Sequence, residues 1–261
     1  MPKSAGNSAA PQHRSLVLDV PSPPPDMRYA DFEDFQNREI LKANGIGQAT
    51  QELLRTLDSN VNVLQAAAAH VLGEMSERTA TQRLWELTTS PDDLVKVEAA
   101  YAIARIGPKD AMERLIGFLD DPLDGYISAP LASGYLARLG DSRGWPVIVE
   151  ALGSGYPEIR MIAAKQLAFF MPFDPGTAIA GAPLDVHREI ARALDDPNTD
   201  VQWQVLSELR DAASADIRTM LEAYASATTD PGLRRAAEEI LRRIDDESRE
   251  TRSLDAGEST P

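Results

Sequence analysis

Residues 95–103 read VKVEAAYAI, and residues 159–167 read IRMIAAKQL. Both stretches place an aliphatic residue at relative position 0, paired alanines at +4 and +5, and an apolar residue at +8. These positions share one face of an α-helix, because successive helical residues are rotated by about 100°. The two stretches therefore predict helices of the same kind, each with one side buried against its neighbours.

The same pattern recurs along the chain, and its spacing is regular. The starting residues of the copies are Val63, Val95, Ile127, Ile159, Val201 and Leu233. Successive starts are 32 residues apart, except for 42 between the fourth and the fifth. An aliphatic residue eleven positions upstream of the four inner starts indicates a preceding helix: Leu84, Ile116, Ile148 and Ile190. We therefore predict an all-α fold, a right-handed α-solenoid of about six two-helix hairpins.

The turns between the helices combine proline with acidic residues, as in residues 90–93 (SPDD) and 195–197 (DDP). Proline ends one helix, and carboxylates favour the positive N-terminus of the next helix. We interpret these acids as helix caps rather than as catalytic carboxylates or calcium ligands. Gly107 and Gly140 are predicted to end second helices as left-handed C-caps. Basic residues near the turns are expected to pair with the acids: Lys96, Arg160 and Arg234.

Composition divides the chain into four parts. Residues 1–25 contain six prolines and predict a disordered arm. Residues 26–46 hold Phe32 and Phe35 and predict an N-terminal helix that caps the first repeat. Residues 47–244 form the repeat array, with an insertion at about 171–182 that is expected to be an exposed loop. Residues 245–261 have few apolar side chains and predict a disordered acidic tail.

The charge and the composition limit the classes of partner. Lys and Arg number 26 and Asp and Glu 41, which gives a net charge of −15 and a field that repels nucleic acid and anionic membranes. A partner with a basic surface is favoured instead. The chain has no cysteine, which excludes disulfides and thiolate zinc sites. Its first apolar run, residues 16–18, is too short for a signal peptide or a membrane span, so we expect a cytoplasmic location.

Residues 47–244 resemble HEAT-like repeat proteins of the short bacterial kind, the group named after phycobilisome lyases. The motif is an Asp-Pro turn, an aliphatic-basic pair, paired alanines and a closing Leu-Gly or Ile-Gly. The aliphatic-basic pairs are residues 95–96, 159–160 and 233–234. The third unit departs from this pattern, because Ser128 replaces the basic residue, and Pro130 and Gly134 predict a kink in its second helix.

The resemblance also implies activities that some HEAT-like proteins have. Bilin lyases suggest a chromophore lyase or chaperone, and alkylpurine DNA glycosylases suggest a repair enzyme, although the net charge opposes DNA binding. Deoxyhypusine hydroxylase binds iron through His-Glu pairs, whereas this chain has His70-Val71 and His187-Arg188. Its third histidine, His13, lies in the arm. No phosphate-binding loop or Gly-x-Ser-x-Gly motif is present, so we expect no metal, no cofactor and no catalytic activity.

In proteins of this kind the second helices line a concave surface, and the helical period identifies the side chains that point away from the core. The large or charged ones form the predicted partner-binding stripe: Val97, Tyr101, Arg105, Met161, Ile162, Lys165, Phe169 and Trp203. The alternative is that Trp203, Met161 and Phe169 pack between repeats. We therefore expect a protein-binding scaffold or adaptor that holds a protein or peptide in its groove.

Overall fold

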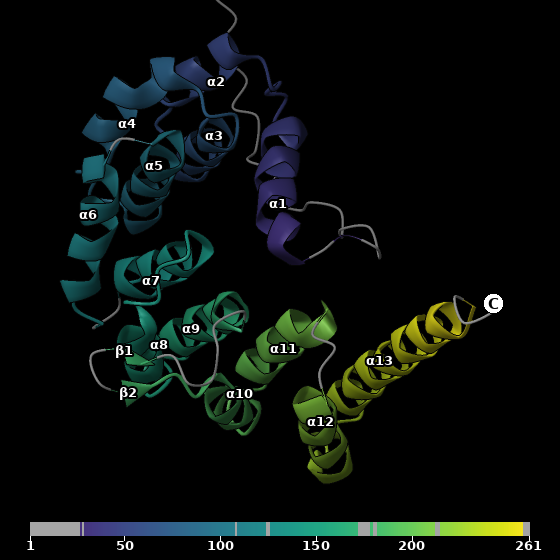
Figure 1. The fold of residues 1–261 in the computed structure, drawn as a ribbon. Helices are drawn as coiled ribbons and strands as arrows, with labels where there is room; N and C mark the ends of the chain where they lie inside the picture. The colour runs from purple at the N-terminus through teal and green to yellow at the C-terminus, as the bar shows by residue number, and fades with distance from the viewer. Residues whose placement is uncertain are drawn as a thin grey trace, which may run out of the picture.

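A computed structural model of the chain describes residues 27, 29–107, 109–123, 126–171, 178–179, 182–211 and 215–257. Within these ranges the helices form six successive hairpins that curve into an arc (Figure 1). The first helices of the hairpins are α2 (Thr50–Thr56), α4 (Thr81–Leu87), α6 (Lys109–Gly117), α8 (Trp145–Ala151), α10 (Val186–Leu194) and α12 (Ala215–Ala227). The second helices are α3 (Asn62–Glu74), α5 (Asp93–Ile106), α7 (Ser128–Arg138), α9 (Pro157–Phe170), α11 (Thr199–Glu208) and α13 (Pro231–Gly257). The predicted α-solenoid is confirmed.

Each second helix packs against the first helix of its own hairpin and against the second helices on either side. The periodic positions are the reason. Ala99 and Ala100 on α5 and Ala163 and Ala164 on α9 are fully buried, and small side chains here let neighbouring helices approach closely. The positions that the sequence pattern assigns to one helix face are thus the positions that are buried in the core.

The short elements lie in the connections within and between hairpins. The 3₁₀ helices are η1 (Arg78–Ala80), η2 (Phe118–Asp120) and η3 (Leu209–Asp211). The strands β1 (Ala178–Ile179) and β2 (Ala182–Pro183) form a two-residue antiparallel ladder in the predicted insertion. Most of that insertion, 172–177 and 180–181, lies outside the described residues, as does the predicted arm of residues 1–25.

The caps follow the sequence prediction at Asp92 and at the two glycines, whereas the cap of α11 is Asn198 rather than Asp195 or Asp196. The carboxylate of Asp92 accepts a hydrogen bond of 3.0 Å from the backbone N–H of Val95 at the start of α5. Gly107 and Gly140 adopt φ of 110° and 83°, a left-handed conformation that costs glycine little because it has no Cβ.

The predicted basic partners of the turn acids are present in two of three cases. Lys96 donates to Asp121 at 2.8 Å, and Arg160 donates to Asp196 at 2.7 Å. Arg234 differs, since its guanidinium donates to the backbone carbonyl of Thr228.

Two expectations about local structure need correction. Helix α7 begins at Ser128, which places Pro130 in the first turn, where no intrahelical N–H donor is required. Pro130 at this position therefore gives no reason to expect a kink in α7. The acidic segment from 245 onward, expected to be disordered, continues α13 as far as Gly257. Residues 245–256 contain no proline or glycine, and Arg218 pairs with Asp245, so nothing ends the helix earlier.

Helix α1 (Tyr29–Ala43) precedes the hairpins and lies on the concave side of the arc, alongside α3 (Figure 1). Its Leu41 is fully buried in the core that α2 and α3 form. Arg38 of α1 also pairs with Glu74 at the end of α3, at 2.5 Å. These contacts anchor the C-terminal half of α1 and direct its N-terminal half along the inner helices.

Candidate functional site

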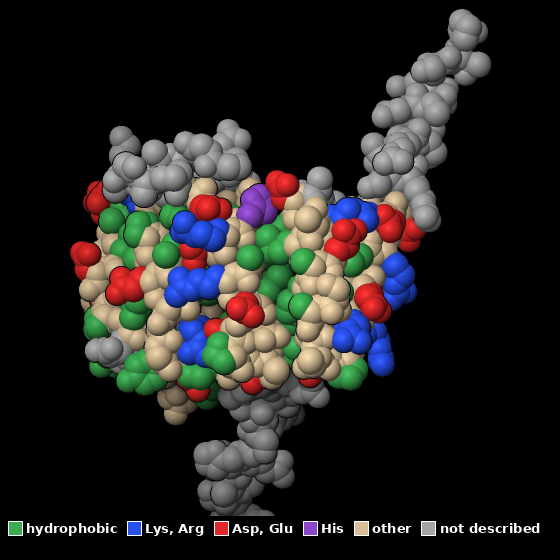
Figure 2. Space-filling view, turned by 90° about the horizontal axis from the view of Figure 1, so that it is seen from below, with side chains coloured by type: hydrophobic (Ala, Val, Ile, Leu, Met, Phe, Trp, Pro, Cys, Tyr) green, Lys and Arg blue, Asp and Glu red, His purple; other side chains and the backbone are tan. Residues whose placement is uncertain are grey.

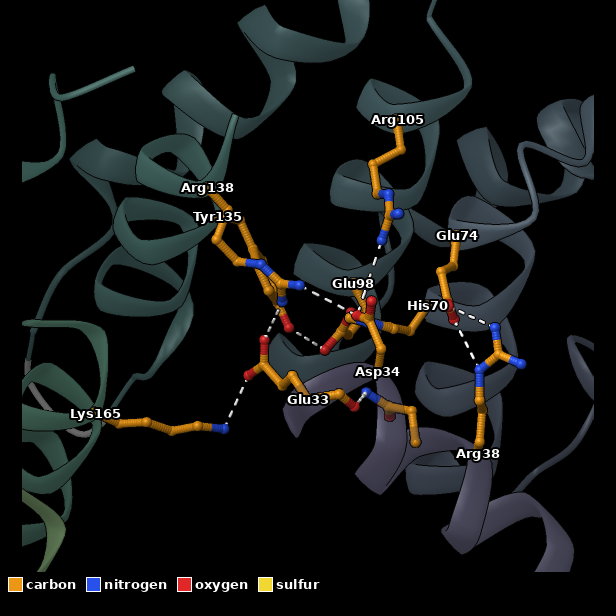
Figure 3. Close-up of polar contacts among 11 residues, drawn as sticks. Glu33, Asp34, Arg38, His70, Glu74, Glu98, Arg105, Tyr135, Arg138 and Lys165 are labelled. Carbon is orange, nitrogen blue, oxygen red and sulfur yellow. Dashed lines mark hydrogen bonds and ion pairs between the residues drawn. The ribbon is translucent and has the colours of Figure 1, made fainter. Parts of the chain in front are cut away.

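The N-terminal half of α1 carries two adjacent carboxylates, Glu33 and Asp34, into a cluster of charged side chains (Figure 3). Glu33 accepts hydrogen bonds from Arg138 on α7 at 2.6 Å and from Lys165 on α9 at 2.8 Å. Asp34 accepts from Arg138 at 3.1 Å and lies 3.9 Å from Arg105 on α5. One turn of α1 is therefore bound by basic side chains from three inner helices.

His70 on α3 joins this cluster to the core. Its Nε2 lies 2.7 Å from the carboxylate of Asp34, and its Nδ1 lies 2.9 Å from that of Glu98 on α5. The hydroxyl of Tyr135 on α7 donates to the second oxygen of Glu98. Since the His70 side chain is fully buried, its contacts with the two carboxylates replace hydration of the ring.

The protonation states follow from these contacts. Burial by itself lowers the pKa of His70, but Glu98 and Asp34 outweigh it and raise that pKa to about 9, so both ring nitrogens donate at neutral pH. Burial raises the pKa of Glu33, yet Lys165 and Arg138 bring it down to about 2. The pKa of Asp34 is likewise lowered to about 2, against its burial, by His70 and Arg138. Glu33, Asp34 and His70 are thus charged at neutral pH.

Aromatic rings enclose the central guanidinium. Tyr101 and Tyr135 stack with centroids 4.1 Å apart, and the guanidinium of Arg138 lies 5.3 Å from the Tyr101 centroid and 5.2 Å from the Phe169 centroid. Arginine over aromatic faces is stabilised electrostatically, particularly away from water. The geometry therefore holds Arg138 in place as an anion-binding group.

Among the described residues, no group of three His, Asp or Glu side chains is arranged to hold a metal ion. Nor is any helix among them long and apolar enough to cross a membrane.

Comparison with known proteins identifies the repeat. Residues 48–134 match a family model described as HEAT repeats. These residues are therefore similar to HEAT repeats. These residues include α3, α5 and most of α7, so the charged cluster is built largely on matched HEAT helices.

Solved structures of similar fold include a crystal structure of an engineered protein, with 22% identity, a TM-score of 0.41, and coverage of 76% of this chain and 96% of that one. Another is the complex of CpcE and CpcF of phycocyanin lyase from Nostoc sp. PCC7120, with 15% identity and a TM-score of 0.46. That match covers 90% of this chain and 100% of the other. At these identities and scores, neither structure bears on function. No curated protein matches the sequence.

The stacked second helices divide the predicted partner-binding stripe into buried and accessible parts. Val97 is fully buried beside α6 and α7, Tyr101 is buried in the same core, and Phe169 is buried under Arg138. They pack between repeats because neighbouring hairpins and α1 cover positions that a single helix would leave open. Met161 and Ile162 are partly buried against two of the cores.

Arg105 and Lys165, predicted as members of the partner-binding stripe, instead contact the carboxylates of α1. Several residues of the cluster were not predicted from the sequence: Glu33, Asp34, His70, Glu98, Tyr135 and Arg138. His70 is followed in the sequence by Val71 and not by a carboxylate, whereas its carboxylate partners are 28 and 36 positions away. The available signal was Glu98, a carboxylate directly before the paired alanines Ala99 and Ala100 of α5.

Trp203 on α11 remains accessible, with 42% of its surface exposed. It borders a hollow of about 200 Å³ between α11 and α13, whose apolar walls include Leu206 and Ile240. Glu239 and Arg243 stand at the same hollow and supply both signs of charge.

A second groove, of about 470 Å³, lies between α10 and α12 and is lined by Leu194, Met220 and Tyr224 among others. Figure 2, seen from the side of these helices, shows a strip of hydrophobic side chains with basic and acidic groups on either side. The hydroxyl of Tyr224 donates to Gln202 at 2.7 Å, so this ring is fixed in the wall of the groove.

Proposed function

We propose that this HEAT-repeat chain is a protein-binding scaffold, and that Trp203 with the hollow beside it contacts the partner. The observation that carries the proposal is that the Trp203 side chain is 42% exposed. Val97, which occupies the equivalent position in the second hairpin, is fully buried. Tryptophan is enriched at the energetic centres of protein interfaces. A large apolar ring at the edge of a hollow fits that role.

The walls of the hollow suggest how the partner is held. Leu206 and Ile240 offer an apolar surface for one side chain of the partner, and Glu239 and Arg243 can form polar contacts at the rim. An apolar centre with a polar rim is the usual arrangement of protein interfaces. The net charge of −15 favours a partner with a basic surface, because long-range attraction speeds encounter.

The test compares Trp203→Ala with Tyr156→Ala, a second exposed aromatic that caps α9 away from the hollow. Each immobilised variant and the wild type are incubated with extract of the native cell, and the retained proteins are identified. We expect at least one protein to be retained by the wild type and by Tyr156→Ala but lost with Trp203→Ala. With that protein purified, Trp203→Ala should weaken binding by about 2 kcal/mol or more.

Unfolding in urea provides the control for this experiment. Because Trp203 is substantially exposed, its removal should lower the free energy of unfolding by less than about 1 kcal/mol, whereas a buried tryptophan would cost about 3 to 5 kcal/mol. If no retained protein depends on Trp203 while the variant stays folded, the surface does not bind a partner and the proposal fails.

A further inference from the structure

The inner face beneath α1 has a local charge opposite to that of the whole chain. Without the carboxylates of α1, the part of this face that Glu33 and Asp34 contact keeps one acid, Glu98. Two more acids lie at its edges, since Glu74 on α3 pairs with Arg38 of α1 and Glu208 on α11 lies near Lys165. Its cationic groups are His70, Arg105, Arg138 and Lys165. Charges within a few ångströms decide which ligand a site accepts, whereas the net charge acts at longer range and is screened by salt. This face is therefore suited to a ligand with adjacent carboxylates.

Helix α1 is held on that face mainly by polar contacts. Among residues 31–43, only Glu33 and Leu41 are buried, and Leu41 belongs to the core at the opposite end of the helix. The ion pairs that join α1 to α5, α7 and α9 are those of Glu33 and Asp34. Buried ion pairs give little net stability, because forming them removes both partners from water. A competing helix that offers the same carboxylates can replace these contacts one for one.

A short connection makes such an exchange possible without unfolding the stack. Helix α1 ends at Ala43 and α2 begins at Thr50, and between them Gly45 has a φ of 74°. A change in this connection would move α1 and withdraw Leu41 from its core, while the hairpins, which pack on one another, remain in place.

We infer that the inner face of α3, α5, α7 and α9 is a binding groove for an acidic helix, and that α1 is the helix it holds in the free protein. The external occupant is a helix of a partner protein with adjacent carboxylates at the position of Glu33 and Asp34. This site is separate from the Trp203 surface and does not depend on the function proposed there.

Binding of a synthetic peptide with the sequence of α1 tests the exchange in the full-length chain. In the wild type the tethered α1 competes at high effective concentration, so the peptide should bind weakly. In Glu33→Gln/Asp34→Asn the tethered helix loses its charges but keeps its shape. The peptide should then bind at least about tenfold more tightly than to the wild type.

Matched controls identify the contacts. Glu39→Gln removes a carboxylate of α1 that pairs with Lys42 on the same helix, and it should leave peptide binding at the wild-type level. A peptide in which Glu33 and Asp34 are replaced by Gln and Asn should not bind either protein. Adding Lys165→Met to the double variant should weaken binding of the unmodified peptide. Equal binding of both peptides, or no gain in the double variant, would overturn the inference.

Hydrogen exchange of the wild type supplies a readout that does not depend on any variant being folded. An exchangeable α1 should open without the stack, so its amides should exchange faster than those of α3 and α5. Exchange of α1 amides only at the rate of global unfolding would show that α1 is a permanent part of the core.

Discussion

Glu33 and Lys165 are 132 positions apart in the sequence, and their carboxylate and ammonium groups meet at 2.8 Å. The pair connects the helix before the first hairpin to the second helix of the fourth hairpin. It forms only if the hairpins stack with the observed curvature (Figure 1). The stability of this contact therefore reports on the assembled arc rather than on any one repeat.

Replacing Lys165, which the sequence predicts to lie in the partner-binding stripe, by Met should destabilise the protein. Glu33 is only 7% exposed, and loss of Lys165 leaves one of its oxygens without the cation that neutralises it. We expect the free energy of unfolding, measured in urea, to fall by roughly 2 kcal/mol. Lys42→Met is the control, since Lys42 is 72% exposed and its ion pair lies at the surface. Loss of that pair should lower the free energy of unfolding by about 0.5 kcal/mol or less. Equal effects of the two changes would contradict the burial of the Glu33 pair.

Stability should depend on pH at both ends of the range. The pKa of His70 is raised from 6.5 to about 9, so its contribution is complete below pH 6.5 and is lost as pH rises through 9. The pKa of Glu33 is lowered from 4.5 to about 2, and that of Asp34 from 3.8 to about 2, so their contributions are complete above those ordinary values and are lost as pH falls through 2. Urea midpoints should therefore be highest between about pH 4.5 and 6.5.

The alkaline part of this dependence can be assigned to His70 by substitution. In His70→Gln the decline between pH 6.5 and 9 should be smaller than in the wild type, whereas His187→Gln on α10 should retain it. An unchanged decline in His70→Gln would show that another group is responsible. The charged and titratable groups that surround His70 are Glu33 and Asp34 on α1, Glu98, Tyr101 and Arg105 on α5, Tyr135 and Arg138 on α7, and Lys165 on α9.

Alanine at Gly73 should be poorly tolerated because α3 and α5 approach closely there. A Cβ on Gly73 would lie 2.5 Å from the Cα of Ala102, so the two helices would have to move apart. We expect Gly73→Ala to lower the free energy of unfolding by about 2 kcal/mol. Gly117→Ala, at the end of α6 with nothing within 4 Å of its new Cβ, should be neutral or slightly stabilising in the same thermal or urea melt.

Replacing Gln166 by Met should leave the protein as stable as the wild type, or more stable by about 1 kcal/mol, because the change removes a buried amide at similar volume. Gln166 is fully buried, and neither its Nε2 nor its Oε1 has a hydrogen-bond partner among the described residues. Gln65→Met is the matched control, since Gln65 donates a buried hydrogen bond of 2.6 Å to the carbonyl of Leu57 and its loss should destabilise by about 1 kcal/mol. A larger loss at Gln166 than at Gln65 would show that the amide of Gln166 has a partner.

The sequence by itself determined the repeat architecture. The helical spacing of apolar positions depends only on residues within one helix. The 32-residue repeat places each such helix at the equivalent position of successive hairpins. Turn residues also act locally, which is why the capping roles of Asp92, Gly107 and Gly140 could be predicted. Where a prediction failed, as at Pro130, the error lay in the boundary of a helix rather than in its existence.

Only the tertiary structure decided which face of the second helices is free. Tyr101 points away from the core of its own helix, but it is buried because α1 and α7 converge on it, and no local pattern describes that convergence. The charged cluster has the same origin, since its members are drawn from α1, α3, α5, α7 and α9. The sequence gives only the net charge of the chain. Binding depends on charges that lie within a few ångströms of the ligand, and these charges come together only when the hairpins stack.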